Sequence, residues 1–426
     1  MLAIHGGVPV RGSVAWPSWP HCDEMTEAAL LLALRSGRLT VSWPSQGSEA
    51  LERRFARAFA EYHGPDALAV AVDHGSSALV VALEALDIGP GDEVIVPAAT
   101  WVATASAVLR VGALPVLADV DAQTGCLSPA AVKNLLSERT RAVIVVHLAC
   151  TVADLPVLVE VTDAAGIDLI EDCAQSHGAR WGDRLVGTFG RVGCFSFQQG
   201  KALSGGEGGA VVVREESLFE RLQALRADSR TYVPRPPAPG TIEIDIGSGL
   251  TGANYCMSDL HAALLLDQLP RLEAQRLHRE KRATELVEAI SHLNVVSEVP
   301  VPDGWKRSIY EYGLQFDLDR LGLPDTRSVA AALSAELGLA VYPPDALLND
   351  SPLLRPRSKR RFSAWWSEEH SRRAFDRAFP GAEAYGRTTV LMHHAALLGT
   401  SQDVADLAAA VEKVFAHRTS LHPGDA

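Results

Sequence analysis

Seven short apolar runs in the first half of the chain predict buried β-strands. Most are apolar throughout and do not alternate with polar residues, as strands with one solvated face do. Strands buried on both faces are typical of a mostly parallel sheet that carries helices on either side. The seven runs are Ala67–Val72, Val94–Val96, Leu114–Ala118, Ala142–His147, Asp168–Ile170, Cys194–Phe197 and Ala210–Val213.

Helical patterns separate most of these runs. Apolar residues recur there at the spacing of a helix with one buried face, over residues 76–86, 101–111, 128–137 and 154–165. Strands that alternate with helices of this length indicate an α/β fold whose central sheet is mostly parallel and has seven strands.

The rest of the chain predicts a second, smaller domain of the α+β class. A long helical stretch from Ser258 to Leu293 contains Pro270, which we expect to kink or divide it. The proline-rich stretch Tyr232–Gly240 predicts an extended loop. The strands and helices expected in the small domain are Ile309–Phe316, Ala340–Tyr342, Thr389–Leu391, 326–337 and 402–416.

These patterns divide the chain into five expected parts. The first two are an N-terminal arm with a helix (1–40) and a large domain (41–257). They are followed by a connecting helix, a small C-terminal domain and a tail, over 258–290, 291–417 and 418–426.

The composition adds several exclusions. A chain of 426 residues is too long for one ordinary core. Its net charge of −13 argues against nucleic acid or an anionic membrane as a partner. The six cysteines form no CxxC pair, which favours reduced thiols over disulfides or a zinc site, so we expect no metal centre. Neither a leader segment nor an apolar run of membrane-spanning length is found, and we expect a cytoplasmic protein.

Lys201 is the first candidate for chemistry. It follows the apolar run Val192–Phe197 after a break at Gly200, in a loop with five glycines between positions 200 and 209. Open α/β sheets bind ligands at the carboxyl ends of their strands. A lysine stripped of water there can act as a nucleophile for Schiff-base chemistry. A surface lysine in a flexible loop is the plain alternative.

Candidate ligand groups follow two other strands. Asp172 comes after an apolar run beside Glu171, and a buried acid there needs a cationic partner unless it caps a helix. Ser76 and Ser77 open a helix after Gly75. Backbone N–H groups and hydroxyls at such a helix start bind anions such as phosphate, although every helix needs a start.

Trp101 and His147 also follow predicted strands. An indole in the position of Trp101 can stack on a planar ligand, and a core tryptophan is the alternative. His147 is either a pocket wall or a hydrogen-bonded core residue. The sequence contains neither GxGxxG nor GxxxxGK[ST], so it favours neither a dinucleotide nor a nucleoside triphosphate.

Four of these features together match one cofactor, pyridoxal 5′-phosphate. This cofactor needs donors for its phosphate, a flat side chain for its ring, an acid for its pyridine nitrogen and a lysine for its aldehyde. Ser76–Ser77, Trp101, Asp172 and Lys201 offer these groups at strand ends of one predicted sheet. The pyridinium also supplies the cationic partner that Asp172 needs.

The motifs resemble those of the DegT/DnrJ/EryC1/StrS family of sugar and cyclitol aminotransferases over nearly the whole chain. The resemblance implies the fold-type I architecture of pyridoxal-phosphate aminotransferases and a homodimer with the cofactor site at the interface. The motifs that carry it are Gly75–Leu79, Glu93–Pro97, Thr100–Ala105, Ile170–Gly178, Phe195–Lys201, Gly206–Gly209 and Asn254-Tyr255.

The same resemblance implies roles for single residues. Lys201 matches the Schiff-base lysine that also shuttles protons, and Asp172 the partner of the ring nitrogen. Gln175 matches the residue near the ring hydroxyl, and Trp101 the stacking aromatic. The implied phosphate ligands are Ser76, Ser77, Ser196 and, reaching across from the other subunit, Asn254.

Within the family, several stretches are most similar to glutamine-dependent inosose aminotransferases of aminoglycoside biosynthesis. Those enzymes aminate a cyclitol ketone such as 2-deoxy-scyllo-inosose or scyllo-inosose, here with glutamine or glutamate as the expected donor. The stretches are Thr100–Ala105, Leu225–Asp228, Arg230–Tyr232, Leu348–Leu353 and His393–Gly399.

The sequence also departs from this group. Cys256 stands where the family usually has arginine, and Gly200 where the inosose group often has serine. Phe195–Lys201 is also close to the version in 3-amino-5-hydroxybenzoate synthases. A nucleotide-ketosugar aminotransferase, a dehydratase/aromatase of that synthase type and a non-catalytic cofactor-binding protein therefore remain alternatives.

Four aromatic residues are candidates for substrate contacts. Trp43 lies in the loop Thr40–Gly47, which is marked by glycine and proline. The others are His147, His393 and His394. An interface turn is the plain alternative for the loop, and a buried polar pair for the two adjacent histidines.

Overall fold

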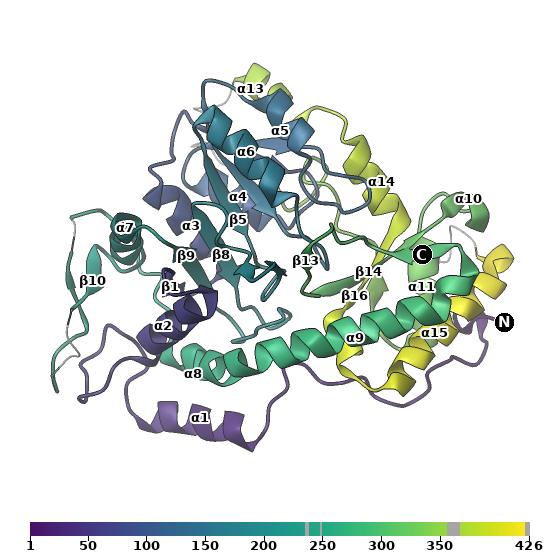
Figure 1. Cartoon of the computed structure of the whole chain (residues 1–426), viewed down its shortest axis with the longest axis horizontal. Coiled ribbons are helices and arrows are strands. Elements are labelled where there is room, and N and C mark those ends of the chain that lie inside the picture. The colour runs from purple at the N-terminus through teal and green to yellow at the C-terminus, as the bar shows by residue number, and fades with distance from the viewer. Residues whose placement is uncertain (235–237, 248, 356–366, 422–426) are drawn as a thin grey trace.

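The computed structural model describes residues 1–234, 238–247, 249–355 and 367–421. A large domain and a smaller one lie side by side, and one long helical segment runs beneath both (Figure 1).

The central sheet of the large domain has seven strands in the order β1-β9-β8-β5-β4-β2-β3. Six strands point the same way, and β9 is antiparallel to both of its neighbours. Each predicted apolar run overlaps one strand, so the α/β fold with a mostly parallel seven-stranded sheet is confirmed. The strands are β1 (Leu68–Val72), β2 (Glu93–Pro97), β3 (Leu114–Ala118), β4 (Thr140–Val146), β5 (Asp168–Asp172), β8 (Val192–Ser196) and β9 (Gly209–Val213).

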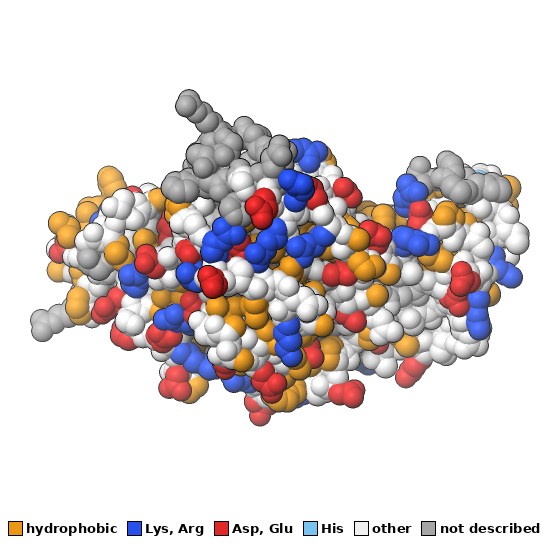
Figure 2. All heavy atoms as spheres, turned by 90° about the horizontal axis from the view of Figure 1, so that it is seen from above, with side chains coloured by type: hydrophobic (Ala, Val, Ile, Leu, Met, Phe, Trp, Pro, Cys, Tyr) orange, Lys and Arg blue, Asp and Glu red, His pale blue; other side chains and the backbone are white. Residues whose placement is uncertain are grey.

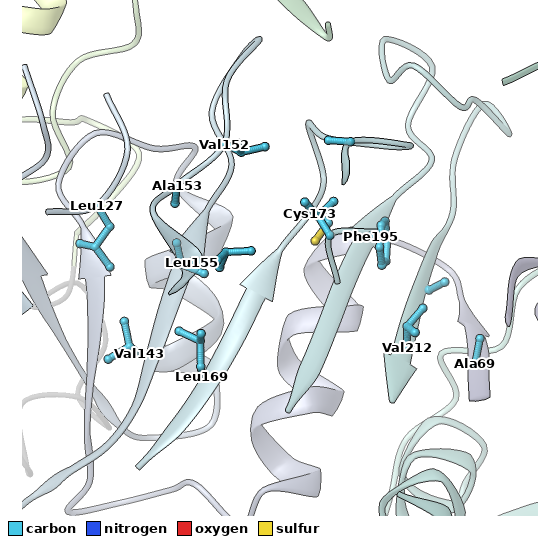
Figure 3. Close-up of a cluster of buried hydrophobic side chains, with 14 of the residues drawn as sticks. Ala69, Leu127, Val143, Val152, Ala153, Leu155, Leu169, Cys173, Phe195 and Val212 are labelled. Atoms are coloured by element: carbon cyan, nitrogen blue, oxygen red, sulfur yellow. The ribbon is translucent and has the colours of Figure 1, made fainter. Parts of the chain in front are cut away.

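Helices cover both faces of this sheet because successive side chains of a strand point to opposite sides. In β1, Ala69 and Ala71 pack into one core and Val70 and Val72 into the other. The first core, shown in part in Figure 3, includes α2 (Leu51–His63), α5 (Pro129–Leu135), α6 (Leu155–Ala165) and α8 (Asp259–Gln268). The second includes α3 (Gly75–Ala85), α4 (Ala103–Arg110) and α7 (Glu216–Arg226).

The small domain is of the α+β class and has its own core. Its four-stranded antiparallel sheet has the order β12-β14-β16-β15. The strands are β12 (Val296–Glu298), β14 (Glu311–Phe316), β15 (Val341–Tyr342) and β16 (Thr389–His393). The helices that pack on this sheet are α9 (Leu272–Ile290), α11 (Arg327–Leu337) and α15 (Ser401–Ala416).

The connection between the domains is divided at Pro270. This residue lies in the 3-10 turn η2 (Leu269–Arg271), between α8 and α9. Proline has no backbone N–H to donate within a helix, so the break falls where the sequence predicts it.

The N-terminal arm packs on the small domain before the chain reaches the large one (Figure 1). Leu2 is buried in the core of the small domain. The carboxylate of Glu336 accepts hydrogen bonds from the backbone N–H groups of Ala3 (2.8 Å) and Val10 (3.0 Å). Helix α1 (Glu24–Arg35) then lies along α8.

The remaining elements are short. Residues 235–237 of the expected loop Tyr232–Gly240 and residues 422–426 of the expected tail lie outside the described residues. The short strands are β6 (Arg180–Trp181), β7 (Arg184–Leu185), β10 (Arg230–Tyr232), β11 (Ile244–Ile246) and β13 (Trp305–Lys306). The short helices and turns are α10 (Leu318–Leu321), α13 (Glu368–Phe375), α14 (Pro380–Thr388), η1 (Ala3–His5), η3 (Ser291–Leu293), η5 (His394–Leu398) and η6 (Arg418–Ser420).

The surface and the cysteines agree with a globular chain. Acidic and basic side chains are mixed across the face shown in Figure 2. All six cysteines are free thiols, four of them buried. Within the described part of the chain, no helix combines the length and the apolar character needed to cross a membrane.

Candidate active site

A cavity of about 470 Å³ lies where the large domain faces the small one. Its floor is formed by the carboxyl ends of β5 and β8 and by the start of α3. From the small domain it is closed by Tyr310, Glu311 and Asp345. A larger hollow of about 730 Å³, between α2 and α7, contains none of the predicted site residues. The predicted residues that line the smaller cavity are Ser76, Trp101, Asp172, Gln175, Ser196 and Lys201.

Lys201 lies in the loop after β8, with its ammonium group under an aromatic ring. The Nζ atom is 4.0 Å from the ring centre of Tyr310, the residue just before β14. Burial lowers the pKa of this amine, and the carboxylates of Glu311 and Asp172 act against that shift. A buried amine of lowered pKa releases its proton more readily than a surface lysine, as a nucleophile must.

The backbone around Lys201 is anchored by parts of the chain that are distant in sequence. The carbonyl oxygen of Gly200 accepts hydrogen bonds from Nε2 of His393 (2.9 Å) and of His394 (3.2 Å). The carbonyl oxygen of Lys201 accepts one from the indole of Trp19 (3.1 Å). The arm and the small domain therefore fix the position of the lysine.

Asp172 ends β5 inside the cavity and is only 6% exposed. Its Oδ2 accepts a hydrogen bond from the Thr104 hydroxyl (3.0 Å), and its Oδ1 one from the Ala174 N–H (3.2 Å). Burial raises the pKa of this carboxyl, and the two hydrogen bonds oppose the rise. Each carboxylate oxygen can accept a second hydrogen bond, so the side chain still has acceptor capacity for a ligand.

Glu171, the residue before it, has a different environment. Its carboxylate is fully buried and accepts hydrogen bonds from the backbone N–H groups of Gly187, Phe189 and Gly190, at 2.8, 2.7 and 2.6 Å. His147 Nε2 donates to the same carboxylate over 3.3 Å. Glu171 thus holds the turn before β8 and does not face the cavity.

The start of α3, where the sequence predicts an anion site, lines the cavity. Its N-cap residue, His74, makes no side-chain cap, so the first N–H groups of the helix are not satisfied in that way. Gly75 allows the turn to approach β8 closely, because a Cβ there would lie 2.5 Å from that of Ser196. Ser76 and Ser196 line the cavity beside this turn, whereas Ser77 is half-buried and does not.

Two further predicted ligands occupy the rim or the wall. The indole of Trp101 lines the mouth and is 52% exposed. Gln175 lines the wall, and its Oε1 accepts a hydrogen bond from the Ala149 N–H (2.7 Å). Asn254 is exposed and does not line the cavity of its own chain.

None of the four candidate substrate residues lines the cavity. Trp43 is 59% exposed, and His147 is fully buried, where its Nδ1 accepts a hydrogen bond from the Ala153 N–H. His393 and His394 instead contact the Gly200 carbonyl. Their contact with substrate stays a prediction.

Several cavity residues were missed from the sequence. Glu311 begins β14, Tyr310 immediately precedes it, and Asp345 comes from the segment after β15. Thr104, from α4, does not line the cavity but donates a hydrogen bond to Asp172. Thr104 belongs to the motif Thr100–Ala105 of the family resemblance, whereas Tyr310, Glu311 and Asp345 carry no local signal.

One group of three potential metal ligands occurs among the described residues. Ligand atoms of His147, Glu171 and Cys173 lie within 4.8 Å of one another. Both nitrogens of His147 and both oxygens of Glu171 already take part in hydrogen bonds. The cluster is therefore accounted for as a buried hydrogen-bond network.

The chain is similar to known aminotransferases in both sequence and fold. The profile of the DegT/DnrJ/EryC1/StrS aminotransferase family matches residues 24–343. The chain is 44% identical to an L-glutamine:2-deoxy-scyllo-inosose aminotransferase of Micromonospora echinospora over 422 residues, 99% of either chain. It is 41% identical to an L-glutamine:scyllo-inosose aminotransferase of Streptomyces griseus, over 97% of each. A crystal structure of 3-amino-5-hydroxybenzoic acid synthase aligns with a TM-score of 0.77 at 28% identity, covering 96% of this chain and 99% of that one.

Proposed function

Because the chain belongs to the DegT/DnrJ/EryC1/StrS aminotransferase family and is an aminotransferase, we propose that it moves the amino group of glutamine to a cyclic polyhydroxy ketone. The proposed ketone is 2-deoxy-scyllo-inosose or scyllo-inosose, in the biosynthesis of aminoglycosides. The relatives that carry these substrates in their names are 41–44% identical over nearly the full chain. The observation that carries the proposal is that Lys201 and Asp172 line one cavity at the strand ends.

The cavity fits pyridoxal 5′-phosphate as the cofactor. Asp172 is a buried acid with spare acceptor capacity, the uncapped start of α3 suits a phosphate, and Lys201 is a buried amine. When bound, the cofactor supplies an aldehyde that carries the amino group and a ring that withdraws electrons.

Lys201 and Asp172 have complementary proposed roles. Lys201 would hold the cofactor. Once released, its Nζ would take the proton from the α-carbon of the amino donor and deliver it to the aldehyde carbon of the cofactor. In the half-reaction with the ketone it would move a proton in the reverse direction. Its lowered pKa suits this exchange near neutral pH. Asp172 holds a proton at the ring nitrogen, and a cation there offsets the cost of ionising this buried carboxyl.

The other lining residues bind and orient. Ser76 and Ser196, with the first N–H groups of α3, are the proposed phosphate donors, and Ser77 lies beside them. Trp101 and Gln175 also line the cavity. In the proposed arrangement Trp101 would cover the cofactor ring, and Gln175 would lie near its hydroxyl group.

We further propose a homodimer in the cytoplasm, without nucleic acid or membrane partners. Helix α1 exposes apolar side chains that a partner would cover, namely Met25, Leu31, Leu32 and Leu34. Asn254 does not line the cavity of its own chain, so in this dimer it would reach the phosphate of the partner's site. Sedimentation of the holoenzyme as a monomer would exclude this arrangement.

The test is a pair of half-reactions with the purified holoenzyme. Glutamine should convert the cofactor to its amino form, followed by absorbance, and 2-deoxy-scyllo-inosose or scyllo-inosose should restore it with release of the amine. Transfer only to a nucleotide-linked ketosugar would overturn the choice of substrate. An aromatic chromophore in place of an amine would indicate the dehydratase/aromatase reaction.

A further inference from the structure

The half of the cavity that faces the small domain is acidic. Glu311 begins β14 opposite His393 of β16, and Asp345 follows β15. Both residues line the cavity with Lys201. Neither Glu311 nor Asp345 belongs to the motifs of the family resemblance or to the site residues predicted from the sequence.

Glu311 is held in place by a side chain from β15, which is separated from β14 by β16 in the sheet. The Tyr342 hydroxyl, on β15, donates to Glu311 Oε1 over 2.7 Å. Within the described residues, Oε2 of this carboxylate accepts no hydrogen bond, so it remains available as an acceptor for a ligand. Glu311 also acts on the charge of the Lys201 amine, so the two side chains share one electrostatic environment.

The charges around the cavity favour ligands that donate hydrogen bonds. Its lining residues within the described chain include the acids Asp172, Glu207, Glu311 and Asp345, one lysine and no arginine. A side-chain carboxylate or a diphosphate would meet like charge there, which costs binding free energy. Hydroxyl and amide N–H groups would meet acceptors.

Both substrates of the proposed function carry groups that donate hydrogen bonds. A polyhydroxy ring presents several O–H groups, and the side chain of glutamine ends in an amide NH₂ with two donors. Glutamate differs from glutamine at this point only, where it presents a carboxylate. Because both substrates occupy the cavity in turn, one acceptor group can serve both.

We propose that Glu311, held by Tyr342, together with Asp345 forms the subsite that binds the ring hydroxyls and selects glutamine over glutamate as amino donor. This inference rests on the proposed function. It assigns donor selection to the small domain, on the side of the cavity away from the phosphate site.

The test compares Glu311→Gln with the wild-type holoenzyme. This variant keeps the shape of the side chain and an acceptor for Tyr342 but removes the negative charge. The ratio of kcat/KM for glutamine to that for glutamate should fall at least about 10-fold, since a hydrogen bond to a charged group is worth at least that factor. The KM for the ring ketone should rise by a similar factor.

Two further variants complete the experiment. Asp345→Asn, at an exposed position, should also lower the ratio of kcat/KM for glutamine to that for glutamate. Glu383→Gln makes the same chemical change at an exposed position of α14 outside the cavity, and should leave the ratio unchanged. Melting temperature and cofactor absorbance check that each variant is folded and loaded.

The outcomes separate this inference from the function on which it rests. A wild-type enzyme that aminates the cyclitol ketone, with ratios in Glu311→Gln and Asp345→Asn within twofold of its own, overturns the inference alone. A wild-type enzyme that fails to aminate the ketone overturns the proposed function.

Discussion

Glu171 and Asp172 are adjacent in β5, yet their carboxylates lie on opposite faces of the central sheet. Glu171 accepts three backbone hydrogen bonds from the turn before β8, whereas Asp172 ends in the cavity beside Thr104. The alternation of side chains along a strand produces this separation. One acid therefore stabilises the fold and the other serves the site, and substitutions should distinguish them.

Asp172→Asn should lose activity while gaining stability. We expect kcat to fall by about 100-fold or more, since the amide cannot support a positive charge at the ring nitrogen. Because burial raises the pKa of Asp172, its native carboxyl holds its proton more tightly than the unfolded one. Its ionisation therefore costs the apoenzyme stability as pH rises above the unfolded pKa.

The apoenzyme of Asp172→Asn should thus melt above the wild type at neutral pH, with the difference shrinking as pH falls toward 4, the ordinary range of an aspartate. Thermal unfolding of both apoenzymes across this range is the measurement. A variant that is less stable than the wild type at every pH would contradict the assigned pKa shift.

Glu171→Gln should show the reverse pattern. The amide NH₂ would face backbone donors, so at least one buried N–H group loses its acceptor. We expect the free energy of unfolding to fall by about 3 kcal/mol. Urea unfolding measures this loss, and Asp163→Asn on the exposed side of α6 is the matched control. Equal stability of Glu171→Gln and the control would refute the structural role.

Lys201→Ala and Asn254→Ala should complement each other in mixed dimers. Each variant alone lacks one group at both sites, so each should be nearly inactive. A mixed dimer has one site with both defects and one with neither. Equal mixing after subunit exchange should therefore restore about a quarter of wild-type activity. If the mixture is no more active than the two variants measured separately, Asn254 does not reach a partner's site.

Glu311→Gln should change the pH dependence of cofactor attachment. The Glu311 carboxylate raises the pKa of Lys201, against the larger lowering by burial. Without that charge, the free amine forms at lower pH. The rate at which the apoenzyme attaches pyridoxal phosphate should then rise with pH around a lower apparent pKa than in the wild type. A shift to higher pH would contradict the electrostatic coupling of the two residues.

The sheet and the two central site residues could be predicted because their signals are local. An apolar run gives each strand, and Asp172 and Lys201 come within a few residues after two of these runs. Helix ends are less well defined: the pattern over 101–111 starts two residues before α4 does, at Ala103. The turn that precedes this helix has the same apolar spacing.

The acidic half of the cavity could not be predicted in this way. Glu311 reaches Lys201 only because the small domain packs against the large one, and Tyr342 reaches Glu311 through a sheet whose strand order differs from the chain order. The place of His147 also depends on the tertiary structure, since its partner Glu171 lies on the neighbouring strand β5.

The hydrogen bonds that Trp19, His393 and His394 make to the backbone at Gly200 and Lys201 limit how this protein can be recombined. The unit that performs the chemistry is not the same as the large folding unit, since its lysine is anchored by both ends of the chain. A chimaera that takes residues 41–257 from this protein and the rest from a relative would carry the lysine without its own anchors. Recombination between relatives therefore preserves this site only if the segments that contain Trp19, Lys201 and the two histidines all come from the same parent.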